Sequence, residues 1–430
     1  MRSPLPRIVI VGAGFAGLQA ARHLRPAAAE VVLIDAQSHH AFIPLVYQVA
    51  TALLPPQRVR FSLARLAHQQ ANLQVRQSTV VTVDLAQKCL RLSDGELPYD
   101  YLVLATGSRP ELSQLPGAEV AALPLAGLAD AIALRNQILN CWQQAAQEPD
   151  PEQRQRLLTV AIVGGGPTGV ELVGGLQELW QGTLQRRYPS LRRERLRLVL
   201  LQAGDRLLAR WPEALSRYTA QHLSRLGIEV RCQARVAAIG PQRVELATGE
   251  AIAAATIVWT GGLVANAPAT QPEITTLSSG QWPVEPSLQL ADHPEVYAVG
   301  DLAAVKDQES LPNVAPVAMQ MGSAAAANLQ RQLRGRSPQP FHYYDKGRAA
   351  IIARYAGLVK TERLQLQGWL GWLLWLLIHV GYLPGWRNQL AVLGAWLGDL
   401  VGRPRSLQRL DPQPYRRPRS ATIEAMIPDQ

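Results

Sequence analysis

The chain has 430 residues, more than one ordinary domain needs, and 47% of them are hydrophobic while 18% are charged. This composition predicts a globular protein of two or three domains with a sizeable core, and it argues against a disordered or low-complexity chain. The net charge of +10 favours an acidic partner, either nucleic acid or an anionic membrane surface.

The first predicted element is a short β-branched strand that runs into a glycine-rich turn. Residues 7–17 read RIVIVGAGFAG, in which Gly12, Gly14 and Gly17 fit the pattern G-x-G-x-x-G. Such glycines allow a tight turn and let a pyrophosphate approach the backbone at the start of the following helix. The next predicted strand ends at Asp35, at roughly the ~20-residue spacing of an acid that binds a ribose. The sequence therefore predicts a dinucleotide site.

Two later segments extend this first site. Residues 101–110 (YLVLATGSRP) and 296–303 (VYAVGDLA) each read as a buried strand followed by a turn of small residues. Asp301 follows Gly300 directly. Its carboxylate suits a sugar-alcohol hydroxyl of a long cofactor, because ionised carboxylates accept hydrogen bonds.

The glycine pattern occurs a second time. Residues 159–169 read TVAIVGGGPTG, with Gly164, Gly166 and Gly169 in the key positions. The interval between the copies is too long for a solenoid repeat, so we expect two nucleotide-binding domains in one chain. An arginine-rich stretch at residues 186–197 is expected to form a solvated surface.

The strand after the second glycine pattern ends in an amide, Gln202, instead of an acid. In an NAD-specific fold, a carboxylate here binds the ribose hydroxyls and repels a 2′-phosphate. An amide bonds a hydroxyl but carries no repelling charge, so we predict that the second domain accepts NADPH, either alongside NADH or in preference to it. The alternative is that Asp205 takes over the role of the acid.

The C-terminal part combines apolar helices with basic residues. Residues 368–386 read GWLGWLLWLLIHVGYLPGW, an apolar stretch shorter than the roughly 20 residues that span a bilayer. A second helix is expected at residues 388–401, and six arginines follow between Arg403 and Arg419. The tryptophans expected at the membrane interface are Trp369, Trp372 and Trp375, and the apolar side of the second helix is expected to carry Leu390, Leu393, Trp396, Leu397 and Leu400. This pattern predicts monotopic binding to an anionic membrane; a buried core helix or a homodimer interface is the alternative.

Two G-x-G-x-x-G units, an ATG turn and a late GD pair together resemble the flavoproteins with two dinucleotide-binding domains, the architecture of glutathione reductase. The resemblance covers about residues 7–340 and implies an α/β fold of two Rossmann-like domains, with FAD in the first and NAD(P)H in the second. The implied organisation is an FAD domain at 1–115 that resumes at 283–340, an NAD(P)H domain at 116–282 and a C-terminal membrane-anchoring region at 341–430.

One branch of this superfamily fits better than the others. Disulfide reductases carry a redox cysteine pair after the first βαβ unit, where this chain reads HHAFIPLVYQVAT (residues 39–51). Its three cysteines, Cys89, Cys141 and Cys232, are far apart and lack metal-ligand spacing, so we expect free thiols and no metal site. Residues 39–51 resemble the matching stretch of type II NADH:quinone oxidoreductases, the single-subunit, non-pumping NADH dehydrogenases.

Two further stretches resemble the same family. Residues 311–329 (LPNVAPVAMQMGSAAAANL) look like the helix that faces the flavin and lines the quinone tunnel, and residues 345–357 (DKGRAAIIARYAG) precede the family's membrane anchor. By this resemblance Gln320 is the family glutamine that bonds a quinone carbonyl. The alternative is that this helix has small residues only because it packs tightly for structural reasons. Glu171, in GPTGVEL, matches a carboxylate near the meeting point of nicotinamide and flavin; as a helix N-terminal acid it needs no function.

The expected site residues fall into three sets. The catalytic residues are Glu171 and Gln320. The cofactor-binding residues are Gly12, Ala13, Gly14, Phe15, Ala16, Gly17, Asp35, Ala36, Val80, Ala105, Thr106, Gly107, Gly164, Gly166, Thr168, Gly169, Gln202, Gly300, Asp301, Ala318 and Met319. The quinone-binding residues are Ala315, Pro316, Met319, Gln320 and Met321, of which Pro316 and Met321 replace glutamines found in other members.

The sequence therefore predicts a peripheral flavoenzyme on the cytoplasmic face of a membrane. It is expected to pass electrons from NADH or NADPH through FAD to a membrane quinone without pumping protons. One alternative is a dedicated naphthoquinone reductase of the demethylphylloquinone type; another is a non-enzymatic, flavin-binding membrane interaction protein. A nucleic-acid partner is disfavoured, because the positive charge concentrates beside a tryptophan-rich helix pair and no binding motif is present.

Overall fold

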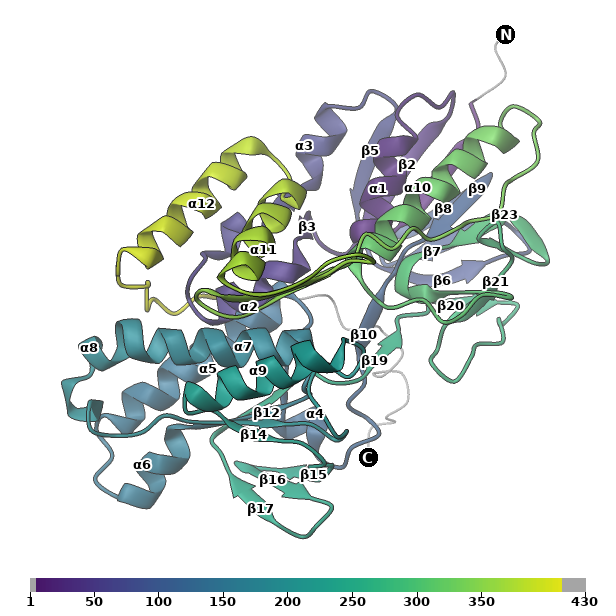
Figure 1. Cartoon of the computed structure of the whole chain (residues 1–430). Coiled ribbons are helices and arrows are strands. Elements are labelled where there is room, and N and C mark those ends of the chain that lie inside the picture. Colours follow the sequence, from purple (N-terminus) through teal and green to yellow (C-terminus); the bar gives the residue numbers. More distant parts are fainter. Residues whose placement is uncertain (1–4, 412–430) are drawn as a thin grey trace.

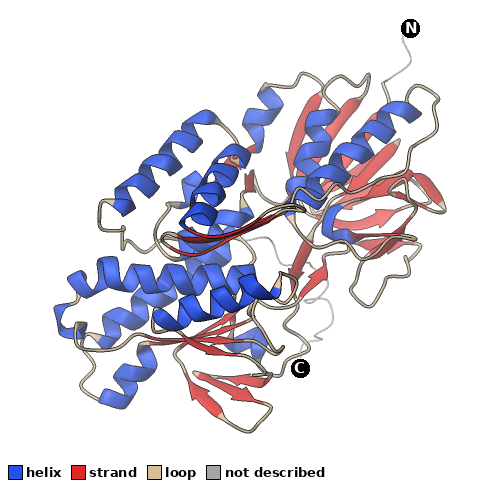
Figure 2. Ribbon diagram, in the orientation of Figure 1, coloured by secondary structure: helices blue, strands red, loops and turns tan. Residues whose placement is uncertain are grey.

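The computed structural model describes residues 5–411, and these form two sheet-based units with a helical C-terminal region lying across both (Figures 1 and 2). Arg416, Arg417 and Arg419 of the expected basic tail lie outside the described residues. The predicted α/β class with two Rossmann-like units is confirmed.

The first unit is built on a six-stranded sheet in the order β22-β23-β9-β1-β2-β5. Its strands are β1 (Arg7–Val11), β2 (Glu30–Asp35), β5 (Leu73–Gln77), β9 (Tyr101–Leu104), β22 (Gln289–Leu290) and β23 (His293–Ala298). All neighbours pair in parallel except β22 with β23. Strands far apart in the sequence thus share one sheet, because β23 pairs with β9.

Helices and small sheets flank this sheet. The helices are α1 (Phe15–His23), α3 (Leu63–His68) and α10 (Ala315–Gln332), whereas α2 (Val46–Ala50) packs on helices of the second unit. Three small sheets accompany the six-stranded sheet. One pairs β3 (His39–Ala41) with β4 (Arg60–Ser62), and another pairs β21 (Trp282–Val284) with β24 (Ala303–Val305). The third contains β6 (Val80–Asp84), β7 (Cys89–Leu92), β8 (Gly95–Pro98) and β20 (Ala269–Gln271). Since β20 pairs with β6, the chain returns to the first unit before residue 283, the expected boundary.

The second unit has a five-stranded parallel sheet in the order β11-β18-β12-β13-β14. These strands are β11 (Leu123–Pro124), β12 (Thr159–Val163), β13 (Arg197–Leu201), β14 (Glu229–Arg231) and β18 (Thr256–Trp259). The helices are α4 (Ala118–Ala121), α5 (Leu128–Ala145), α6 (Pro151–Leu157), α7 (Pro167–Leu179), α8 (Gln185–Arg187) and α9 (Glu213–Arg225). A small sheet of β15 (Val236–Gly240), β16 (Arg243–Leu246) and β17 (Ala251–Ala253) lies beside it, and β10 (Ser108–Pro110) pairs with β19 (Leu263–Ala265) between the units.

The C-terminal region consists of a three-stranded sheet followed by two helices. Its elements are β25 (Arg348–Ala353), β26 (Ala356–Lys360), β27 (Gln365–Gly368), α11 (Trp369–Tyr382) and α12 (Trp386–Leu400). Glycines let the sheet approach its neighbours closely: a Cβ on Gly174 of α7 would clash with the Ile352 carbonyl, and one on Gly357 would clash with the backbone of α11 at Trp372.

The two C-terminal helices divide their large apolar side chains between core and surface, which corrects the expected single apolar face. Trp375 is fully buried, stacked on His379 at 4.0 Å between ring centroids, and Trp396 is 6% exposed. Leu390 and Leu397, by contrast, are 59% and 63% exposed. Trp375 and Trp396 are therefore core residues, because the sheet and the 39–54 segment cover the side of each helix that carries them.

Arg405, expected in a free basic tail, is buried instead in an ion cluster. Its side chain is 4% exposed and donates to Glu178 on α7 at 2.9 Å and to Asp399 on α12 at 2.9 Å. Arg354, after β25, binds the same Asp399 carboxylate at 2.6 Å. Burial acts to raise the pKa of Asp399, but hydrogen bonds and charge from Arg405 and Arg354 outweigh it and hold this pKa below its usual value. The cluster therefore fastens the end of α12 to the second unit.

Replacing the central arginine tests this role. In Arg405→Met the Glu178 carboxylate loses its ion pair and Asp399 keeps Arg354 alone of its two arginines, so we expect a loss of about 3–5 kcal/mol in the free energy of unfolding and faster hydrogen exchange across residues 403–411. Arg409→Gln is the matched control. Arg409 is exposed and bonds the Asn140 and Gln143 side chains of α5, so its loss should cost less than about 1 kcal/mol. Equal losses in the two variants would show that the buried cluster has no special role.

Candidate functional site

The three glycines of the first loop have separate structural causes. Gly12 has φ +98°, and a Cβ there would clash with the Ala105 carbonyl. Gly17 packs so closely that a Cβ would clash with the Gly12 carbonyl, which brings α1 against the loop. A Cβ on Gly14 would meet nothing within 4 Å, so the surface above the loop is open to a ligand. This is the cradle that a pyrophosphate requires.

Asp35 is fixed at the carboxyl end of β2, beside this loop. Its Oδ2 accepts a hydrogen bond from the Ala13 N–H at 2.6 Å, and its Oδ1 accepts one from the Gln37 N–H at 2.7 Å. The Ala13 carbonyl is held in turn by the Nδ1 of buried His40 at 2.9 Å. Burial lowers the pKa of His40 to about 4, so at neutral pH the ring is neutral and Nδ1 carries the proton that it donates.

Asp301 and Thr106 place further polar groups at the same edge of the first sheet. The Ser108 hydroxyl donates to Asp301 Oδ2 at 2.6 Å, and burial raises the pKa of Asp301 although this bond opposes the rise. Thr106 Oγ1 is buried and has no hydrogen-bond partner within residues 5–411. A buried polar group without a partner is costly, so a ligand that bonds Thr106 and Asp301 fits here. These residues fit the flavin dinucleotide that the motifs predict.

The second loop repeats the first with one chemical change. Gly164 has φ +120° and a Cβ on it would press on Thr260 and Gly261, while a Cβ on Gly169 would clash with the Gly164 carbonyl. The Gly165 N–H donates to Gln202 Oε1 at 3.0 Å, the bond that Asp35 makes in the first unit. Because Oε1 is held by a donor, Nε2 is the amide group left to face a ligand.

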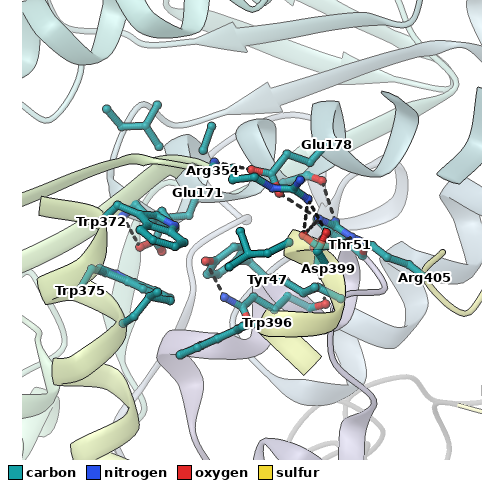
Figure 3. A pocket seen from close by; sticks show the side chains of 18 residues that line it. Tyr47, Thr51, Glu171, Glu178, Arg354, Trp372, Trp375, Trp396, Asp399 and Arg405 are labelled. Atoms are coloured by element: carbon teal, nitrogen blue, oxygen red, sulfur yellow. Dashed lines mark hydrogen bonds and ion pairs between the residues drawn. The ribbon is translucent and has the colours of Figure 1, made fainter. Parts of the chain in front are cut away.

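Glu171 lies on α7, inside a pocket where both units meet the C-terminal region (Figure 3). Its Oε1 accepts a hydrogen bond from the Ile351 N–H of β25 at 3.2 Å. No ion pair reaches it from the described chain, and burial raises its pKa to about 8, with the Ile351 bond acting in the opposite direction. At neutral pH the carboxyl group is therefore mostly protonated.

Tyr47 and Gln48 of α2 line the same pocket. Trp396 Nε1 donates to Gln48 Oε1 at 2.8 Å, and Gln48 Nε2 donates to the Tyr47 hydroxyl at 2.9 Å. Burial, together with the nearby Glu171 carboxylate, raises the pKa of Tyr47. The cavity has a volume of about 50 Å³, which is room for a few water molecules. The pocket thus holds two neutral proton-bearing groups, Glu171 and Tyr47.

Helix α10 packs on α1 through small residues. A Cβ on Gly322 would clash with the Ala16 carbonyl, and Met321 is buried, its sulfur accepting from the Gly300 N–H at 3.2 Å. Gln320 lies on another face, where its Nε2 donates to the Tyr344 carbonyl at 2.9 Å and its Oε1 accepts from the Tyr344 N–H at 3.0 Å. The structure therefore gives the glycine and Met321 a packing role and anchors the Gln320 amide to the main chain.

The remaining predicted site residues surround the two loops or begin the helices that follow them. Phe15 and Ala16 open α1, and Phe15 contacts His40 edge-on at 5.0 Å. Thr168 is the second residue of α7, and Ala315, Pro316, Ala318 and Met319 lie in the first turns of α10. Ala36 follows β2, Val80 begins β6 and Gly107 follows β9.

Comparison with known proteins agrees with this geometry. Residues 6–322 match the family model described as pyridine nucleotide-disulphide oxidoreductase. The chain is 33% identical to the type II NADH:quinone oxidoreductase Ndh of Mycobacterium tuberculosis, covering 96% of this chain and 92% of that protein. The chain belongs to the type II NADH:quinone oxidoreductase family.

Two further relatives widen the family comparison. The demethylphylloquinone reductase NdbB of Synechocystis is 27% identical over 94% of this chain and 98% of its own length. The structure of NDH2 from Plasmodium falciparum in complex with NADH has a TM-score of 0.85 at 17% identity and covers 93% of this chain and 99% of that one, which shows a shared fold. This type II family member is therefore an oxidoreductase and not a non-enzymatic binding protein.

Several residues that line the Glu171 pocket could not be predicted from the sequence. Tyr47 and Gln48 lie inside the stretch that carried the family resemblance, but no local signal shows that they face Glu171. Glu178 lies seven residues after Glu171 on α7, the spacing that returns to the same helix face. Arg405 carried no signal, because its partners Glu178 and Asp399 come from elements that only the fold brings together.

The raised pKa of Glu171 predicts a pH-dependent stability. An unfolded glutamic acid titrates near its ordinary value of 4.5, whereas the folded group titrates at about 8. Between these values the folded state binds more protons than the unfolded state, so this group's contribution to stability falls as pH rises from about 4.5 to 8. Glu171→Gln mimics the neutral acid, so its melting temperature should rise relative to wild type from pH 5 to pH 8. A difference that does not change with pH would show that Glu171 titrates normally.

Proposed function

We propose that this family member is a monotopic flavoenzyme that oxidises NADH or NADPH through FAD and reduces a membrane quinone without pumping protons. The observation that carries the proposal is the pair of glycine loops, each open at the carboxyl edge of its own parallel sheet, in a chain whose relatives are named as quinone oxidoreductases. When bound, the flavin supplies the hydride acceptance and the two-electron delivery.

The chain's own residues bind and orient in this scheme. The first loop and Asp35 hold the adenosine half of FAD, and Asp301 bonds its ribityl chain. The second loop and Gln202 hold the nicotinamide nucleotide, and Glu171 keeps a proton in the pocket where the two units meet the C-terminal region. Holding two reactants in the correct orientation supplies a large part of the reduction in activation free energy.

The quinone is proposed to arrive along α10, on the side of Gln320. Both amide groups of Gln320 bond Tyr344, so a quinone carbonyl would share a donor or displace the main chain there. Met321 faces the core and contributes through packing. Quinol formation needs protons, and the neutral Glu171 and Tyr47 groups, which share one buried pocket, are proposed as donors.

The membrane face is proposed to be the exposed apolar side of α11 and α12. Eight large hydrophobic side chains there are between 41% and 76% exposed: Trp369, Leu370, Leu373, Leu377, Trp386, Leu390, Leu397 and Val401. Such a concentration on two neighbouring helices marks an interaction surface, and tryptophans suit a lipid interface. No helix among residues 5–411 is long and apolar enough to cross a membrane. On this proposal the protein lies on the cytoplasmic side.

Charged substitutions on this face test the membrane proposal. Leu390→Asp combined with Leu397→Asp removes two apolar side chains from the lipid contact, a loss of about 3 kcal/mol or more, or roughly a hundredfold in vesicle binding. Reduction of the flavin by NADH should be unchanged. Val120→Asp is the control, since Val120 is 93% exposed on the second unit. Retained vesicle binding in the double variant would place the membrane contact elsewhere.

A dedicated naphthoquinone reductase is the second candidate, favoured by the similarity to the demethylphylloquinone reductase of Synechocystis. The acceptor distinguishes the two functions. Steady-state turnover should be compared for ubiquinone-, plastoquinone- and naphthoquinone-type acceptors with one electron donor. Broad use of acceptors supports the respiratory type of enzyme, whereas a preference for naphthoquinones above about a hundredfold in kcat/KM supports the biosynthetic type.

The second loop is proposed to accept NADPH as well as NADH. Gln202 presents Nε2, a hydrogen-bond donor, where a carboxylate would present a negative oxygen. A donor binds a 2′-phosphate or a ribose hydroxyl, whereas a carboxylate repels the phosphate. Asp205 is exposed on the following turn, and the half-buried Arg206 bonds the Ala209 carbonyl at 2.9 Å.

Restoring the acid tests this specificity. Gln202→Glu should lower kcat/KM for NADPH by roughly ten- to a hundredfold, about 1–3 kcal/mol, while NADH use is kept. Gln221→Glu, the same change on the exposed surface of α9, should leave the ratio of the two cofactors unaltered. An equal effect of Gln202→Glu on both cofactors, or a wild-type preference for NADH above about a hundredfold, would contradict the assignment.

A further inference from the structure

A second cavity lies at the edge of the proposed membrane face. It has a volume of about 380 Å³ and is bounded by α12, the loop at residues 52–57 and the segment at residues 403–410. This size falls within the ~300–1,000 Å³ of small-molecule sites. Its lining includes Arg135, Arg403 and Arg405 but only one carboxylate, Asp399.

Arg135, one of two buried arginines that line the cavity, has no carboxylate partner among the described residues. Arg135 is 3% exposed, and its Nη2 donates to the carbonyls of Ser406 at 2.7 Å and Gln408 at 3.0 Å. Its Nε is buried without a hydrogen-bond partner, and no carboxylate pairs with it within residues 5–411. Arg405, by contrast, is balanced by Glu178 and Asp399. The two carbonyl oxygens that bond Arg135 carry no full negative charge, and a buried cation without a paired anion is costly, so this wall of the cavity favours an anionic ligand.

The cavity opens beside the apolar surface of α12. Gly394 follows Leu390 by four residues and precedes Leu397 by three, so it shares their helix face. A Cβ on Gly394 would meet nothing within 4 Å, and Gly394 and Gly398 both line the cavity. A ligand in the cavity would therefore lie level with the boundary between exposed leucines and exposed Arg403.

We propose that this cavity binds the phosphate of an anionic phospholipid headgroup, with Arg135 and Arg403 as the cationic groups and Gly394 leaving the entrance open. The lipid's acyl chains would continue along Leu390 and Leu397. This proposal rests on the membrane docking proposed above, because the membrane would supply the lipid. Arginine suits this role because its planar guanidinium matches phosphate oxygens.

Short-chain lipids in solution test the site without a membrane. Dihexanoyl phosphatidylglycerol, below its micelle concentration, should bind the full chain saturably and raise its melting temperature. Dihexanoyl phosphatidylcholine and inorganic phosphate should bind at least about tenfold more weakly. Gly394→Leu, which fills the entrance, and Arg403→Gln should each weaken phosphatidylglycerol binding about tenfold, the effect of one charge-assisted hydrogen bond or more.

The matched control is Arg387→Gln, which removes an exposed arginine from the first turn of the same helix, away from the cavity. It should leave binding of the short-chain lipid unchanged. An equal loss in Arg387→Gln and Arg403→Gln would overturn the site, as would inorganic phosphate binding as tightly as the lipid. Binding to phosphatidylglycerol vesicles separates the two proposals. If the protein binds vesicles but not the short-chain lipid, the cavity site is wrong and membrane docking stands. If it binds the short-chain lipid but not vesicles, membrane docking is wrong and the cavity is an anion site.

Discussion

The close contact between α7 and β25 is the constraint on which the assembly of this protein depends. Gly174 leaves no room for a Cβ against the Ile352 carbonyl, so any larger residue would push the C-terminal sheet away from the second unit. Two carboxylates on the same face of α7 complete this contact. Glu171 accepts from the Ile351 N–H at 3.2 Å, and Glu178 accepts from the Arg354 N–H at 2.5 Å. The region that carries the apolar helices is thereby fixed to the nucleotide-binding unit.

This contact gives these two carboxylates different chemistry. Glu178 meets the Arg405 guanidinium at 2.9 Å and belongs to a structural cluster. Glu171 accepts a hydrogen bond from a backbone N–H but has no arginine partner in the described chain, and burial raises its pKa to about 8. Identical side chains seven residues apart on one helix, lining the same pocket, thus become an anchor and a proton-holding group, because only Glu178 has an arginine counter-charge in the described chain.

Local spacing was enough to predict both glycine loops and the residues that end the neighbouring strands. Asp35 and Gln202 both accept hydrogen bonds from their loops, since a βαβ unit fixes these positions over few residues. Long-range packing was not predictable in the same way. Trp375 reads as an interface residue but is buried against His379, and Gln320 bonds Tyr344, 24 residues later in the chain. Arg405 pairs with Glu178, which lies 227 residues earlier in the sequence.

On the proposed function, one chain passes electrons from a nicotinamide to a quinone through a flavin bound at the first loop. Anaerobic stopped-flow absorbance of the full-length holoenzyme tests it most directly. NADH or NADPH should bleach the flavin absorbance in a first mixing step, and a quinone should restore it in a second, at a rate that sustains steady-state turnover. Bleaching that no ubiquinone-, plastoquinone- or naphthoquinone-type acceptor reverses would contradict the account.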